Sequence, residues 1–187
     1  MKIGVFDSGI GGLTILKELL SLRPNNQYIY YGDNINLPYG EKSKEELIKI
    51  GDNIINYFIN QNVNLIILAC GTMSSVIDKS KYKVKIIDII EPTVEYLKGI
   101  NTKSVLLLGT TRAIEEGIFK RKLEENNILV YDKACPKFVL ILENKIKENI
   151  DIVIDEYLKE FKYKSFQHII LGCTHFSLID NKISEYL

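Results

Sequence analysis

Two cysteines follow segments that are typical of buried strands. Cys70 comes directly after the apolar run Leu65–Ala69, and Cys173 comes directly after the segment 168–172. A short run of branched apolar residues indicates a strand that is buried on both faces, and parallel sheets bind ligands at the carboxyl ends of their strands. Small polar residues follow each cysteine, so the pattern predicts a thiol at a strand end beside a helix N-terminus.

Two such thiols on opposite sides of a cleft would form a pair of matched bases. The helix dipole favours the thiolate and should lower the pKa of each cysteine from ~8.5. One thiolate would remove an acidic carbon-bound proton while the other thiol returned a proton to the opposite face, which inverts the carbon without a cofactor. Taken singly, each cysteine also fits the role of a small buried hydrophobic residue. Cys135, which precedes Pro136, is predicted to be structural.

Two carboxylates offer both a chemical and a structural interpretation. Asp7 ends the first predicted strand beside the turn DSGIGG, where it is either a helix cap or a base that orients a thiol. The turn is either a tight connection or a helix N-terminus that holds a substrate carboxylate through backbone N–H groups. It matches neither a GxGxxG nor a Walker motif. Glu143 lies on a predicted helix among apolar residues, where a solvated or capping glutamate is the common case.

Two further side chains keep alternatives open. Tyr39 stands between Pro38 and Gly40, so it either closes over a ligand or packs the loop. His175 lies two residues after Cys173, which leaves a Cys–His hydrolase conceivable because the turning chain does not fix their geometry. No CxxC or HxxxH spacing supports zinc, and we expect no metal and no cofactor.

Composition limits the remaining classes of function. The chain has 187 residues with 24 basic and 24 acidic side chains, so its charge gives no reason to expect nucleic acid or membrane partners. No apolar run approaches the ~20 residues that span a bilayer. The sequence begins directly with a predicted strand, and its cysteines are odd in number. We therefore expect reduced thiols and a cytoplasmic location.

Strand and helix patterns alternate along the chain, which favours a parallel α/β fold. The pattern starts again at Ser104, and the two halves keep one offset: Cys173 lies 103 positions after Cys70, and Thr110 lies 103 positions after Asp7. Two coincident offsets are compatible with chance and with duplication. If the halves are related, both cysteines can border one cleft between them.

The chain resembles a known family, the cofactor-independent aspartate/glutamate racemases, and among them it is most similar to the glutamate racemases. The similar stretches lie in order over nearly the whole chain and include IGVFDSGIGG, YYGDNINLPYG, LIILACGTMSS, IIEPTVE, VLLLGTTRAI, CPKFVLILE and IILGCTHFSLI. The resemblance implies two flavodoxin-like α/β domains with the active site in the cleft between them. It also implies glutamate as substrate, D-glutamate for peptidoglycan as product, and often a homodimer. The expected domains are 1–92 with 176–187, and 93–175.

The resemblance also implies roles for individual residues. Cys70 corresponds to the base that takes the α-proton of D-glutamate, and Cys173 to the base that takes it from L-glutamate. Positions that flank or tune the thiols are matched by Asp7, His175 and Glu143. Positions that bind substrate are matched by Ser8, Pro38, Tyr39, Gly40, Gly71, Thr72 and Thr174.

Some positions depart from the family pattern. Gly71 stands where the family usually has Asn, and Ala113 where it usually has Thr, so two side-chain contacts are expected to be missing. On this basis, Gly71→Asn should raise catalytic efficiency. Family members continue beyond the last predicted helix, so we expect a C-terminally truncated chain whose first sheet is incomplete. Racemisation of another acidic amino acid such as aspartate, or an inactive fragment, remain the alternatives.

Overall fold

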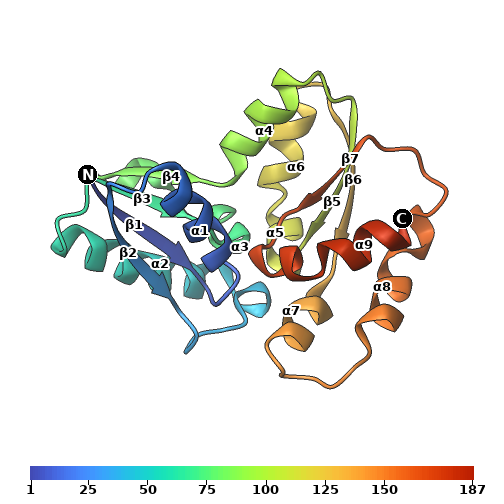
Figure 1. Ribbon diagram of the computed structural model, residues 1–187, viewed down its shortest axis with the longest axis horizontal. Coiled ribbons are helices and arrows are strands. Elements are labelled where there is room, and N and C mark those ends of the chain that lie inside the picture. Colours follow the sequence, from blue (N-terminus) through green and yellow to red (C-terminus); the bar gives the residue numbers. More distant parts are fainter.

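The computed structural model describes residues 1–187 as two parallel sheets, each with its own helices (Figure 1). The first sheet has the order β2-β1-β3-β4 and consists of β1 (Lys2–Asp7), β2 (Gln27–Gly32), β3 (Leu65–Leu68) and β4 (Lys85–Asp88). The second has the order β6-β5-β7 and consists of β5 (Ser104–Gly109), β6 (Leu129–Ala134) and β7 (His168–Leu171). Every strand pair is parallel, which confirms the predicted two-domain α/β fold.

The helices of the first domain begin and end close to the predicted positions. They are α1 (Leu13–Leu22), the 3-10 turn η1 (Tyr39–Glu41), α2 (Lys44–Asn60), α3 (Gly71–Ser74) and the 3-10 turn η2 (Lys79–Lys81). The predicted capping box starts α2: the Ser43 hydroxyl accepts from the Glu46 amide at 3.2 Å, and the Ser43 amide donates to Glu46 Oε2 at 3.0 Å. The apolar face of α2 packs against the first sheet in the same core that contains Cys70.

The second domain contains α4 (Ile90–Gly99), α5 (Thr111–Glu116), α6 (Ile118–Glu124), α7 (Pro136–Leu142), α8 (Ile150–Leu158), η3 (Lys159–Phe161), η4 (Thr174–Ile179) and α9 (Asp180–Tyr186). The helix expected over 113–126 is divided at Gly117, whose φ of 65° ends α5. The helix expected over 137–147 ends at Leu142, with Asn144 left-handed at φ 54°. None of the helices combines the length and the apolar character that crossing a membrane requires.

The helices beside both expected domain boundaries pack on the second domain, and only the C-terminal one departs from the expectation. Helix α4 buries Ile90, Val94 and Leu97 in a core of the second domain. Helix α9 and the preceding η4 bury Phe176 and Ile183 in the other core of that domain. The chain therefore crosses from one domain to the other once, between β4 and α4, and 176–187 belong to the second domain.

The predicted relation between the two halves is visible in the topology. The order β2-β1-β3 in the first sheet repeats as β6-β5-β7 in the second. Strands β3 and β7 each consist of four residues and lead directly to a cysteine loop. Because the strand order corresponds as well, the shared offset reflects a similarity of the two halves and not chance. Both cysteines therefore lie at equivalent strand ends.

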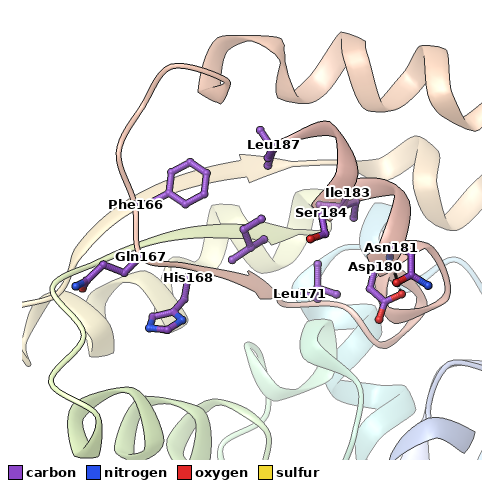
Figure 2. Close-up of a pocket in the computed structure, with 10 residues that line it drawn as sticks. Phe166, Gln167, His168, Leu171, Asp180, Asn181, Ile183, Ser184 and Leu187 are labelled. Carbon is purple, nitrogen blue, oxygen red and sulfur yellow. Dashed lines mark hydrogen bonds between the residues drawn. The ribbon is translucent and has the colours of Figure 1, made fainter.

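The faces of the sheets are unequally covered. The second sheet lies between two large apolar cores, whereas one face of the first sheet has only a small buried group, Ile3, Val5 and Ala69, under α1. Helix α1 itself buries no residue completely. The outer edge of β7 has no partner strand, and a cavity of about 540 Å³ lies between this edge and α9 (Figure 2). No cysteine lines that cavity.

We predict that amides of α1 exchange with solvent faster than those of α2, although both helices are amphipathic. Helix α2 buries five residues and α1 buries none, so local opening of α1 exposes less apolar surface. Amides of β5, which lies between two large cores, should exchange most slowly. Hydrogen exchange followed by mass spectrometry tests this order. Protection of α1 equal to that of β5 would contradict it.

Candidate active site between the domains

The carboxylate of Asp7 organises the end of β1. Its Oδ2 accepts hydrogen bonds from the amides of Gly9 and Gly12, at 3.1 and 3.0 Å. Its Oδ1 accepts one from the hydroxyl of Thr174, at 3.1 Å, which comes from the second domain. Asp7 thus caps the glycine-rich turn. The amides of Gly9 and Gly12 bind this carboxylate and are not available to a substrate carboxylate.

Cys70 lies where β3 passes into α3, at the predicted strand end. It occupies the residue before the first turn of α3, and its thiol is buried. The Ser8 hydroxyl from the β1 turn and the backbone amides of Thr72 and Met73 favour its thiolate. The charge of Asp7 opposes the thiolate. Residues from the ends of β1 and β3 therefore converge on this thiol.

Cys173 occupies the equivalent place between β7 and η4 and is also buried. Its Sγ lies 3.8 Å from Nδ1 of His175, and Nε2 of the same ring lies 2.5 Å from Oε1 of Glu143. When Nε2 carries a hydrogen and donates it to Glu143, Nδ1 can accept the hydrogen of the Cys173 thiol. Glu143, at the end of α7, is therefore a partner of the imidazole, and the alternative of a freely solvated carboxylate is wrong.

The pKa values of the thiols shift in the direction opposite to the one expected from helix dipoles. Burial, the largest cause, raises the pKa of Cys70 to about 11, from an ordinary value of 9.0. Burial also raises the pKa of Cys173, and the charges of Cys70 and Asp7 raise it further. Helix α3 has four residues and η4 is a 3-10 turn, so their dipoles are too weak to outweigh desolvation.

The loop after β2 approaches the same region. The Tyr39 hydroxyl donates to Oδ2 of the buried Asp33 at 2.6 Å, while its ring packs edge-on against Phe6. The structure shows the packing role, since the ring is part of a core. Burial and the hydrogen bond to Asp33 raise the pKa of the Tyr39 hydroxyl, and the charge of Cys70 raises it further. Pro38 and Gly40 line a small hollow of about 10 Å³ against Thr110 of the second domain.

The two domains are closed over the thiols. Thr72 and Thr110 share a hydrogen bond between their hydroxyls at 2.8 Å, and both are buried. None of the five principal cavities is lined by Cys70, Cys173 or Asp7. The structure therefore brings the expected site residues together where the two domains meet.

Three polar residues of this interface were not selected from the sequence. Tyr30 donates its hydroxyl hydrogen to the Gly9 carbonyl at 2.5 Å, Asp33 anchors Tyr39, and Thr110 contacts Thr72. Asp33 and Thr110 directly follow β2 and β5, so the rule that polar residues at strand ends approach a ligand site could have found them. Tyr30 lies inside a strand, and no sequence signal marks its hydroxyl.

Two parallel-sheet domains that bring one strand-end cysteine each to a shared interface are an arrangement of cofactor-independent racemases. Residues 15–187 match the Asp/Glu/Hydantoin racemase family, and the chain belongs to it.

Individual relatives agree with this assignment. The chain is 40% identical over 192 residues to a glutamate racemase of Thermoanaerobacter pseudethanolicus, covering 99% of this chain and 72% of that protein. It is 42% identical over 195 residues to one of Hydrogenobaculum sp., covering 100% and 75%. The crystal structure of glutamate racemase from Francisella tularensis in complex with D-glutamate superposes with a TM-score of 0.90 at 37% identity, covering 100% of this chain and 73% of that chain.

We predict that Cys70 reacts slowly with iodoacetamide at pH 7, and that its rate rises about tenfold per pH unit up to the highest pH at which the fold persists. A thiol with a pKa of about 11 is almost fully protonated at neutral pH, and only the thiolate is nucleophilic. Peptide mass mapping after timed alkylation measures each cysteine separately. The urea-unfolded chain is the control, and its rate should level off near the ordinary thiol pKa. A plateau below pH 8.5 in the folded chain would contradict the prediction.

Proposed function

We propose that this chain interconverts L- and D-glutamate with Cys70 and Cys173 as two opposed bases. The observation that carries the proposal is the position of the two buried thiols, one from each domain, at equivalent strand ends of one interface. The named function of the relatives, over nearly the whole of this chain, supports glutamate as the substrate. As a member of the racemase family, the chain is an isomerase.

Each turnover moves one proton off the α-carbon and another onto it. For D-glutamate, the thiolate of Cys70 takes the α-proton and becomes a thiol. The planar carbanion that remains then takes a proton from the thiol of Cys173 on its opposite face, which yields L-glutamate and a thiolate at Cys173. Proton exchange with solvent restores the starting state, and the reaction of L-glutamate runs through the same steps in reverse.

The raised thiol pKa values are compatible with this chemistry because the substrate carries its own charge. The α-ammonium group of glutamate would bring a positive charge next to the thiols, which favours the thiolate. Once water is excluded from the closed interface, this attraction is stronger than it is in solution. Asp7 beside Cys70 and His175 beside Cys173 are placed to hold the proton that each thiol gives up.

The remaining substrate positions are proposed for Ser8, Thr72, Thr174 and the loop Pro38–Gly40. Ser8 and Thr174 lie beside Asp7 and the thiols, and Thr72 follows Cys70 at the domain boundary. Ser8, Thr72 and Thr174 carry hydroxyl groups, and the loop offers backbone amides. Such neutral donors can form hydrogen bonds to the carboxylates of the substrate. No metal and no organic cofactor enters the proposed steps.

A cellular role follows from the product. D-glutamate is an expected precursor of peptidoglycan, and a cytoplasmic location is supported by the three cysteines, all of which are free. Equal numbers of acidic and basic residues give no reason for a nucleic acid or membrane partner. A homodimer is supported by exposed apolar side chains on and beside α1, including Ile10, Leu13, Leu20 and Leu22. Light scattering at several protein concentrations measures the assembly.

We predict that Cys70→Ser and Cys173→Ser each lower racemisation by ~10²-fold or more, because a hydroxyl is a far weaker base than a thiolate. Circular dichroism of glutamate follows racemisation from either enantiomer, and α-deuterium incorporation from D2O follows proton transfer. Cys135→Ser is the matched control, because the Cys135 thiol is buried in a core of the second domain, where its Sγ lies 3.8 Å from the Lys133 carbonyl, and its variant should leave turnover intact.

Three outcomes would bear against the proposal in different ways. Substantial turnover in either interface variant would show that the two-thiol mechanism is wrong. Turnover of L-aspartate in preference to L-glutamate would replace the substrate but keep the mechanism. A folded parent chain that racemises neither would support the alternative of an inactive member of the family.

A further inference from the structure

The two domains meet backbone to backbone at Gly71. A Cβ atom placed on Gly71 would lie 1.9 Å from the carbonyl oxygen of Gly172 and 3.0 Å from its carbonyl carbon. Both atoms belong to the main chain of the second domain, so neither can turn aside as a side chain could. Carbon and oxygen atoms in close contact are separated by ~3.3 Å, and any side chain at Gly71 would therefore push the domains apart by roughly 1.4 Å.

The constraint at Gly71 is steric and does not come from its backbone angles. Gly117 is the only glycine with a positive φ, and Gly71 forms the first turn of α3, where other residues fit equally well. A second contact of the same kind occurs at Gly11, whose Cβ would lie 2.7 Å from the His175 amide nitrogen. At these two glycines of the first domain, a Cβ atom would therefore collide with the main chain of the second domain.

The position of Gly71 in the sequence links this contact to the reacting groups. Gly71 directly follows Cys70, and Gly172 directly precedes Cys173. The neighbouring residue Thr72 forms the buried hydroxyl contact with Thr110 across the same boundary. A change in separation at Gly71 is therefore passed directly to the distance between the thiols.

We propose that Gly71 is a positioning residue that sets the closest approach of the two domains, and with it the separation of the two thiols around the substrate. The expected effect on catalysis rests on the proposed function. The expected effect on closure of the domains rests on the geometry alone. Substrate enters when the domains separate, and the reactive arrangement forms when Gly71 returns to the Gly172 carbonyl. The structure therefore reverses the expectation for Gly71→Asn, which should lower catalytic efficiency.

Gly71→Ala tests the proposal, with Gly99→Ala as the matched control. Gly99 ends α4 with no atom near the place of a Cβ, so its variant should behave as the parent. In Gly71→Ala, kcat should fall by ~100-fold, the loss expected for a misplacement of about 1 Å, with a much smaller change in KM. Without substrate, the alkylation rate of Cys70 and Cys173 should be lowest in the parent, higher in Gly71→Ala and highest in Gly71→Asn.

Cys135 distinguishes domain opening from unfolding. It is completely buried in a core of the second domain, so opening leaves it protected and unfolding exposes it together with the other two cysteines. Alkylation and kcat of Gly71→Ala that equal those of Gly99→Ala would overturn the proposal, as would equal exposure of all three cysteines. A parent chain without racemase activity would defeat the proposed function, while the alkylation order would still decide the role of Gly71 in closure.

Discussion

The buried carboxylate of Asp7 joins the glycine-rich turn of the first domain to the second domain through its hydrogen bonds. A buried carboxylate is strongly unfavourable unless hydrogen bonds replace its lost hydration, and hydrogen bonds to a charged group contribute about 1.5–3 kcal/mol each. Asp7 is completely buried and accepts bonds from Gly9, Gly12 and Thr174. The two glycine amides fix the turn within the first domain, whereas Thr174 comes from the second. Separation of the domains therefore breaks one of these bonds and returns the carboxylate to water.

The same burial determines what the thiols can do. In the closed domains, desolvation raises the pKa of both cysteines, so the chain without substrate holds two protonated thiols. A positive charge that enters the interface, such as the α-ammonium group of an amino acid, would favour the thiolate. Burial thus protects the cysteines from oxidation and alkylation until substrate is present, because both reactions proceed through the thiolate.

The sequence was sufficient to predict the features that depend on local pattern. The buried runs before Cys70 and Cys173, the capping box at Ser43 and the division into two similar α/β halves all follow from the spacing of residues along the sequence. Features that depend on contacts between distant segments could not be predicted. The packing of α9 on the second domain is one example. Another is the pKa of the Cys70 thiol. The helix dipole lowers this pKa and desolvation raises it, and the extent of desolvation depends on how completely the domains bury the thiol.

The interface also shows how a duplicated fold can serve mirror-image substrates. Asp7 ends β1 and contacts Thr174, the residue after Cys173, while Thr110 follows β5 and contacts Thr72, two residues after Cys70. Each domain thus uses the end of its first strand to hold the cysteine loop of the other. A pseudo-twofold arrangement of this kind presents one base to each face of the α-carbon.

The chemical surroundings of the two bases nevertheless differ. Asp7, a carboxylate, has Thr110 as its counterpart, and the pair formed by His175 and Glu143 is present only beside Cys173. The fold supplies symmetry of position, which two-sided proton transfer requires. The polar residues break that symmetry, so the barriers for proton removal from the two enantiomers need not be equal, although the overall equilibrium constant between enantiomers is fixed at one by their mirror symmetry.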